Sequence, residues 1–183
     1  MPKLNREGRA LVMDPAQIKQ VFAELDPPHR LIAQLCYYTA SRVGEIVSLK
    51  REAIIGQSLV IRQPKTGRVK EVRIHEPLRA ALDPVRLPSR GYLFPGGGKT
   101  GHLTVRGFEK KLSAAYALLG IRGASTHSFR RSMATHLYRA GVDLESIRQL
   151  TGHRSLQSLT LYIDVGRDEA DKKIADAIAV FMN

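Results

Sequence analysis

Apolar residues recur at intervals of three and four positions along much of the chain, which is the period of helices that bury one face. The clearest case follows Asp14, which is suited to cap a helix whose first residue is Pro15. The apolar stripe of this segment consists of Ile18, Val21, Phe22 and Leu25. We therefore predict a first helix over about residues 15–25.

Seven later segments carry the same period or the residues that begin and end helices. Gly120, Gly141 and Gly152 each follow a helical pattern and are suited to end it, because glycine enters the left-handed conformation easily. Asp143 and Ser155 are suited to cap the two short helices on either side of Gly152. The later predicted helices lie within residues 29–40, 42–49, 104–120, 128–140, 144–150, 156–163 and 168–183.

The pattern changes to an alternation of apolar and polar residues between residues 53 and 75. β-branched residues are frequent there, and the turn sequences GQ and KTG divide the stretch. Ile61, Val72 and Ile74 alternate with polar neighbours, as in a hairpin with one buried face. The chain is therefore expected to form one α+β domain that is mostly helical and contains one small sheet.

Charge narrows the choice of partner. Lys and Arg number 29 and Asp and Glu number 17, which gives a formal net charge of +12. This excess favours a polyanion such as duplex DNA, although a basic surface can also serve solubility alone. The chain has no tryptophan and few other aromatic residues, so stacking on single-stranded bases is less favoured.

Two absent sequence patterns, a membrane span and a secretory signal, bear on where in the cell the protein is expected. No apolar run reaches the roughly 18 residues of a membrane span, and the N-terminus has no apolar core of a secretory signal. A cytoplasmic protein without a membrane partner is therefore expected. The single cysteine, Cys36, lies in an apolar run and is expected to be a buried structural thiol.

Several polar residues lie at the ends of the predicted elements. Arg42 and Glu45 are three residues apart at a helix start, so they share a face and can form an ion pair. His127 and Arg130 have the same spacing. Taken singly, such pairs are most often surface ion pairs or capping groups, and a hairpin lysine such as Lys65 is most often solvated.

Residues 152–162 read GHRSLQSLTLY and allow two interpretations. The capped helices on either side of the glycine suit a helix-turn-helix that docks on DNA. Alternatively, His153 and Tyr162 are chemical groups, with the tyrosine hydroxyl as a nucleophile. The apolar residues expected to anchor the second helix to the core are Leu156, Leu159 and Leu161.

Four segments, in their order along the chain, resemble the motif series of the tyrosine recombinase, or phage integrase, family: TASRVGEI, PKTGRVKEVRI, THSFRRSMATHL and LTGHRSLQSLTLYI. The resemblance runs from about residue 12 to about residue 170. It implies the family's catalytic fold, a helical domain with a small antiparallel three-stranded sheet. It also implies a site made of Arg42, Lys65, His127, Arg130, His153 and Tyr162, with Glu45 in support.

The resemblance implies a site-specific DNA recombinase that integrates, excises, inverts or resolves DNA through a covalent 3′-phosphotyrosyl intermediate. Tyr162 would be the nucleophile. Arg42 and Arg130 would hold the anionic phosphate oxygens, because a guanidinium keeps its charge and presents a fixed fork of donors.

Further roles follow from the same resemblance. His127 would accept the proton of Tyr162, and His153 would donate a hydrogen bond to a phosphate oxygen. Lys65, at the tip of the hairpin, would protonate the departing 5′ oxygen, and Glu45 would orient the first arginine.

The expected partner is double-stranded DNA, bound by a monomer that assembles into a homo-tetramer on it. Basic residues expected to contact the DNA backbone are Arg68, Lys70, Lys110, Lys111, Arg131 and Arg154. No cofactor or metal is expected, because no His, Cys and Asp cluster has ligand spacing. The sequence GGGKT at residues 96–100 lacks the upstream glycine of a phosphate-binding loop.

Two other functions stay open. A type IB topoisomerase uses a similar set of residues to relax supercoils. A non-catalytic helix-turn-helix protein would explain the charge and the DNA partner, but would leave Arg42, Lys65 and His127 without a role.

The catalytic domain is expected to occupy residues 1–183, with a flexible segment at residues 1–12. The helical core-binding domain that precedes it in most family members is not expected here, so the chain is either a fragment or a naturally single-domain enzyme. In the C-terminal helix, the stripe of Ile174, Ile178 and Phe181 would pack on its own domain or on a neighbouring protomer.

Overall fold

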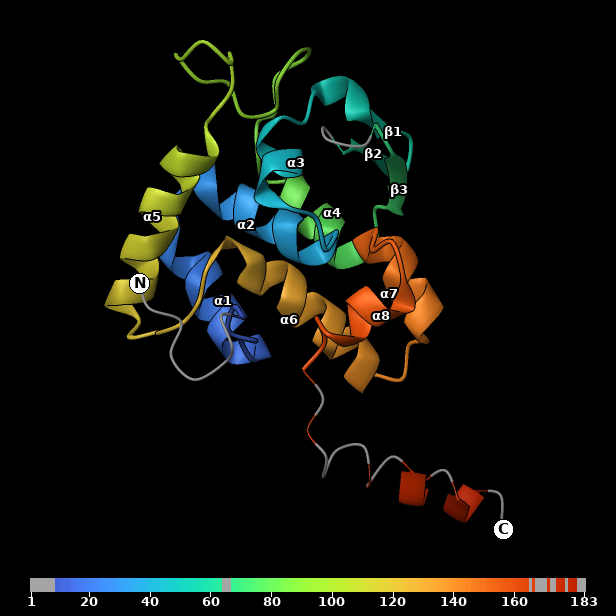
Figure 1. The fold of residues 1–183 in the computed structure, drawn as a ribbon. Coiled ribbons are helices and arrows are strands. Elements are labelled where there is room, and N and C mark those ends of the chain that lie inside the picture. The colour runs from blue at the N-terminus through green and yellow to red at the C-terminus, as the bar shows by residue number, and fades with distance from the viewer. Residues whose placement is uncertain are drawn as a thin grey trace.

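The computed structural model describes residues 9–63, 67–164, 166, 171, 174–176 and 178–180. Within these ranges, a three-stranded antiparallel sheet lies at one side of a helical body (Figure 1). The predicted α+β class, mostly helical with a small sheet, is confirmed.

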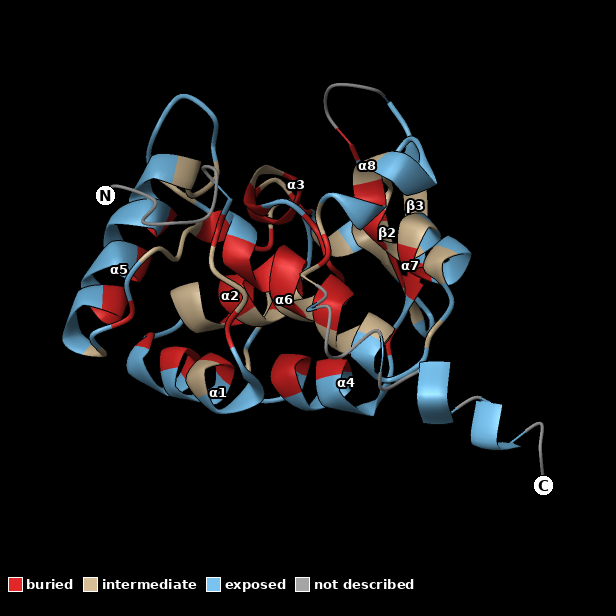
Figure 2. Cartoon of the chain, turned by 60° about the horizontal axis from the view of Figure 1, so that its bottom comes forward, coloured by how far each residue is buried: buried red, intermediate tan, exposed pale blue. Residues whose placement is uncertain are grey.

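The long helices form the body of the domain. α1 (Pro15–Glu24) begins as predicted, because the Asp14 carboxylate accepts a hydrogen bond of 2.8 Å from the backbone N–H of Gln17. α2 (His29–Tyr38) packs against α6 (Thr126–Arg139), and α5 (Val105–Leu118) covers one side of the pair. Figure 2 shows the consequence: burial is concentrated on α2, α3 and α6, whereas α1 and α5 keep exposed outer faces.

The sheet follows α3 (Val43–Val47) and a short 3-10 helix, η1 (Arg51–Ala53). Its strands are β1 (Ile54–Ile55), β2 (Ser58–Arg62) and β3 (Val69–Arg73), with β2 in the middle and antiparallel to both neighbours. Ile61, Val72 and Ile74 are buried, as predicted from their alternation. α4 (Glu76–Leu82) was not predicted, because its seven residues are too few to show a helical period.

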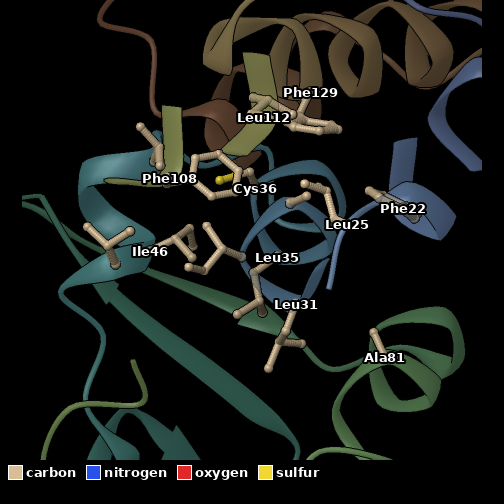
Figure 3. Close-up of a cluster of buried hydrophobic side chains, with 14 of the residues drawn as sticks. Phe22, Leu25, Leu31, Leu35, Cys36, Ile46, Ala81, Phe108, Leu112 and Phe129 are labelled. Atoms are coloured by element: carbon tan, nitrogen blue, oxygen red, sulfur yellow. The ribbon is translucent and has the colours of Figure 1, made fainter. Parts of the chain in front are cut away.

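A large apolar core joins the long helices to the sheet. Figure 3 shows side chains from α1, α2, α5 and α6 meeting around Cys36, which is fully buried as expected for a structural thiol. The labelled members are Phe22, Leu25, Leu31, Leu35, Ile46, Ala81, Phe108, Leu112 and Phe129. This core holds α3 and the start of α6 in fixed positions, and both carry predicted site residues.

A second, smaller cluster lies under α7 (Leu144–Thr151) and α8 (Leu156–Thr160). It consists of Ala134, Ile147, Leu159 and Ile163, with Tyr162 among the side chains packed against it. The prediction for the other two leucines is wrong: Leu156 and Leu161 are exposed. α8 has only five residues, so a single side chain, Leu159, reaches the space between α6 and α7.

Residues 174–176 and 178–180 are helical and lie away from the body of the domain in Figure 1. Ile174 and Ile178 are exposed, so the expected packing on the chain's own domain is not observed for them. Phe181 lies outside the described residues. Among the helices that the structure describes, none is long and apolar enough to cross a membrane.

Candidate active site

Five of the six predicted catalytic residues come together around one cavity. The cavity has a volume of about 760 Å³, and its lining includes Arg42, His127, Arg130 and His153. Tyr162 lies beside it, with its ring centroid 4.9 Å from that of His153. Lys65, the sixth, lies outside the described residues.

Arg130 is the most deeply placed of the site residues. It is 2% exposed, and its Nη1 donates a hydrogen bond of 2.7 Å to the carbonyl oxygen of Ala40. Its Nη2 is buried and has no hydrogen-bond partner among the described residues. A buried guanidinium with an uncommitted donor next to a cavity is suited to bind an anion.

Arg42 lies at the edge of the same cavity, immediately before α3. Its Nη1 donates to Glu45 Oε1 at 3.0 Å, and its backbone N–H donates to Glu45 Oε2 at 3.0 Å. The Glu45 side chain is 3% exposed, whereas that of Arg42 is 47% exposed. The ion pair that the spacing of the two residues predicts is therefore present, and part of the Arg42 guanidinium stays accessible.

His153 follows α7, which ends at Gly152 in the left-handed conformation with φ 66°. His153 Nδ1 lies 2.7 Å from the hydroxyl oxygen of Thr151, which is fully buried. Burial, together with the positive charges of Arg130, Arg42 and Lys70, lowers the pKa of His153 to about 4. The imidazole is therefore neutral at pH 7.

Tyr162 contacts both Arg130 and Arg131, which are consecutive on α6. Its ring is 5.8 Å from the guanidinium carbon of Arg130, and its hydroxyl donates a hydrogen bond of 3.3 Å to the carbonyl oxygen of His127. Burial raises the pKa of the phenol, and the charges of Arg130 and Arg42 oppose that rise. On the other side, Arg131 Nε donates a hydrogen bond of 2.7 Å to the Tyr162 carbonyl oxygen.

Two of the residues predicted to contact DNA are committed elsewhere, so that prediction is wrong for them. Arg131 is 3% exposed and donates hydrogen bonds to the carbonyl oxygens of Tyr162 and Ala10. Lys70 Nζ donates to the carbonyl oxygens of Thr39 at 2.7 Å and Leu150 at 2.8 Å. The internal acceptors come from distant segments, and no local pattern indicates them.

The other basic residues of that prediction are accessible. Arg68 and Arg154 are exposed and contribute to the lining of the cavity, while Lys110 and Lys111 are exposed on α5. Thr151 was not predicted to take part, since a polar residue two positions before a histidine carries no signal of its own. Within the described ranges, no three His, Cys, Asp or Glu side chains lie close enough together to hold a metal ion.

The arrangement combines three chemical capabilities in one place. Two guanidinium groups can bind a phosphate-like anion, a phenol lies beside them as a potential nucleophile, and two imidazoles are available for proton transfer. These groups come from four separate segments of the chain, which the fold brings together.

The sequence matches a family model and several known proteins. The model of the phage integrase family matches residues 12–169. Tyrosine recombinase XerD of Rhizobium meliloti (strain 1021) is 33% identical over 150 residues, which cover 75% of this chain and 47% of the relative. The integrase of Escherichia phage P2 is 29% identical over 164 residues, which cover 90% of this chain and 44% of the relative. The chain thus spans about half the length of these relatives.

Solved structures share the fold. The crystal structure of XerA recombinase superimposes with a TM-score of 0.75 at 19% identity, covering 92% of this chain and 65% of the other. XerH site-specific recombinase bound to difH substrate, in a pre-cleavage complex, gives a TM-score of 0.68 at 18% identity, covering 91% of this chain and 54% of the other. Because the family model covers most of the sequence, the chain belongs to the phage integrase family.

Proposed function

We propose that the protein is a site-specific DNA recombinase that cleaves and rejoins strands through a covalent 3′-phosphotyrosyl intermediate. The observation that carries this proposal is the convergence of Arg42, His127, Arg130 and His153 on one cavity, with Tyr162 beside it. A non-catalytic DNA-binding protein would not need this convergence. The structurally similar XerH is a site-specific recombinase that was solved with its substrate bound before cleavage, which supports DNA as the partner.

Arg42 and Arg130 would bind the two non-bridging oxygens of the scissile phosphate. Negative charge accumulates on these oxygens in the pentavalent transition state, and preorganised guanidinium donors stabilise it there. Tyr162 would attack phosphorus, and the 5′ oxygen would leave. The covalent intermediate keeps the energy of the phosphodiester bond, so a 5′ hydroxyl from another strand can rejoin it without ATP.

Arg68 and Arg154, exposed at the cavity, are placed to contact neighbouring phosphates. Lys65 keeps its proposed role as the general acid that protonates the 5′ oxygen. We also propose that the protein works in the cytoplasm, is monomeric in solution and forms a tetramer on DNA. The exposed apolar residues Ile174 and Ile178 offer a contact to a neighbouring protomer, and light scattering with and without DNA tests the assembly.

The test is capture of the covalent intermediate from a pool of nicked duplexes in which the sequence around the nick is randomised. The nick lets a short 5′-hydroxyl fragment diffuse away, so the adduct accumulates and survives denaturation. The wild-type protein is expected to form an adduct on Tyr162, and Tyr162→Phe is expected to form none. An adduct that persists in Tyr162→Phe contradicts the proposal.

The same experiment separates the competing functions. Binding without any adduct indicates a non-catalytic protein. Relaxation of supercoiled plasmid without strand exchange between two captured sites indicates a topoisomerase.

A further inference from the structure

Lys70 binds backbone carbonyl groups in two segments that lead into the candidate active site. Its Nζ donates a hydrogen bond of 2.7 Å to the carbonyl oxygen of Thr39 and one of 2.8 Å to that of Leu150. Thr39 lies three positions before Arg42, and Leu150 lies three positions before His153. One ammonium group therefore joins two backbone segments that each continue into a residue lining the cavity.

The first segment is the turn between α2 and α3. Ala40 has φ 49° there, the left-handed conformation that is unfavourable for a residue with a Cβ. Lys70 binds the carbonyl group of the peptide bond before Ala40, and Arg130 Nη1 binds that of the peptide bond after it, at 2.7 Å. Because these two peptide planes set φ and ψ of Ala40, the two cations hold the turn in this conformation. The Ala40 carbonyl is thereby fixed as the acceptor for Arg130, whose Nη2 has no partner among the described residues.

The second segment is the C-terminal end of α7. The last carbonyl groups of a helix have no partner within it, and the helix dipole stabilises a cation near them. Leu150 is the next-to-last residue of α7, and its carbonyl oxygen accepts from Lys70. Gly152 then turns the chain in the left-handed conformation, and His153 follows. The bond from Lys70 therefore fixes the backbone just before the turn that places His153.

Lys70 is itself held by the sheet. It belongs to β3 and pairs with Ile61 on β2, which is fully buried. β3 lies beside α7 (Figure 1), and the apolar cluster under α7 has only four buried residues. Because so small a cluster holds α7 weakly, the placement of this helix depends on its contact with Lys70.

We propose that Lys70 is a positioning residue, which sets the place of His153 relative to the two arginines of the cavity. An ammonium suits this task because it has three donors and no acceptor, so it can bind two carbonyl oxygens at once. Lys70 acts through the backbone and is not expected to contact DNA. Its effect on the reaction rests on the proposed function, whereas its effect on the geometry does not.

The geometry is tested without DNA by pulsed electron paramagnetic resonance. Spin labels at Lys110→Cys in α5 and Gln149→Cys in α7, both exposed positions, report the distance from the helical body to α7, and Cys36 is buried and stays unlabelled. The distance distribution should be narrow with Lys70 present and broader or shifted in Lys70→Met. Lys70→Arg should restore it, because Lys70 lines a cavity of about 670 Å³ that has room for a guanidinium, which can also bind two carbonyl oxygens. An unchanged distribution in Lys70→Met overturns the inference.

The effect on the reaction is tested by single-turnover adduct formation on a captured nicked duplex at saturating concentration. Lys70→Met should lower the rate about 10- to 100-fold, since a displacement of about 1 Å can cost that much, while the Kd for DNA stays within about threefold. Lys70→Arg should recover most of the loss. Circular dichroism checks that each variant is folded. If Lys70→Met is unfolded, Lys70→Gln, whose shorter amide cannot reach both carbonyl oxygens, takes its place.

Gly120→Ala separates positioning from a general loss of stability. Gly120 has φ 66° and does not line the cavity, so alanine there strains the backbone outside the site and should leave the rate within about threefold of wild type. A rate loss in Lys70→Met no larger than in Gly120→Ala, or a Kd weakened more than threefold, overturns the positioning role. If the wild-type protein forms no adduct on any substrate, the proposed function fails, whereas the distance measurement still decides whether Lys70 places α7.

Discussion

The buried guanidinium of Arg131 holds the backbone of Tyr162: its Nε donates a hydrogen bond of 2.7 Å to the Tyr162 carbonyl oxygen. The same guanidinium donates to the carbonyl oxygen of Ala10, and its Nη2 lies 3.8 Å from the Asp164 carboxylate. Its neighbour Arg130 faces the cavity instead. Two consecutive arginines on α6 therefore have different surroundings: Arg130 lines the cavity, and Arg131 binds the backbone of the proposed nucleophile.

Arg131→Met should destabilise the protein by about 2 kcal/mol, because it leaves the carbonyl oxygens of Ala10 and Tyr162 without their charged donor. It should also slow adduct formation by about tenfold or more, since the backbone of Tyr162 loses its fixed position. Urea unfolding and single-turnover kinetics measure the two effects.

Arg139→Met is the matched control for this change, because Arg139 is exposed near the end of the same helix. It should change the free energy of unfolding by less than about 0.5 kcal/mol. Equal effects of the two substitutions would contradict a special role for Arg131.

Substituting alanine for Gly152 and for Gly120 would measure the effect of one contact, the one that a Cβ at Gly152 would make with Gln63. Both have φ 66°, but a Cβ at Gly152 would lie 2.6 Å from Gln63 Nε2, whereas a Cβ at Gly120 would meet nothing within 4 Å. Gly120→Ala should cost about 1 kcal/mol of backbone strain. Gly152→Ala should cost about 1 kcal/mol more, because the buried Gln63 side chain has to move.

A double-mutant cycle with Gln63→Ala checks the cause. In that background Gly152→Ala should cost no more than Gly120→Ala, as measured by urea unfolding. If the extra cost remains without the Gln63 side chain, the strain has another origin.

Lys70 should make stability depend on pH. Burial, with the charge of Arg130, lowers its pKa from the ordinary 10.5 to about 7 in the folded protein. Between about pH 7 and pH 10 the unfolded chain therefore binds more protons than the folded one, so the contribution of Lys70 to the free energy of unfolding rises with pH. The free energy of unfolding of the wild type, relative to that of Lys70→Met, should therefore increase from about pH 7 to about pH 10.

Urea unfolding at several pH values measures this difference. Lys110→Met, at an exposed position on α5, is the control. Its free energy of unfolding should change with pH in parallel with that of the wild type. Parallel curves for Lys70→Met as well would show that the ammonium is not buried as described.

Local features of the fold were predictable because their causes are local. The cap at Asp14, the left-handed Gly152 and the buried alternation of Ile61 and Val72 each depend on a few neighbouring residues. The grouping of Arg42, His127, Arg130, His153 and Tyr162 was expected only from the resemblance of the motif series to the tyrosine recombinase family. Taken singly, these residues carry no local signal that brings them together.

The internal hydrogen bonds of Lys70 and Arg131 could not be predicted from the sequence. Lys70 is bonded to carbonyl oxygens 31 and 80 residues away, and Arg131 to carbonyl oxygens 31 and 121 residues away. Sequence alone assigns a basic residue in a basic protein to the surface, since burial requires acceptors that only the tertiary fold supplies. The same holds for Thr151, whose importance comes from the geometry of one helix end.

Two parts of the candidate active site are held in place by apolar clusters of different size. Arg42 and Arg130 belong to elements held by the large core. His153 and Tyr162 follow α7 and α8, which are held by a cluster of only four buried apolar residues and by hydrogen bonds from Lys70 and Arg131. A small cluster opens at a lower free energy than the whole domain. We therefore expect α7 and α8 to open more readily than the rest of the domain, which would move the proposed nucleophile away from Arg42 and Arg130 while the large core stays intact. Amide exchange in α7 and α8 would then report readiness for catalysis, and exchange in α2 would report global stability.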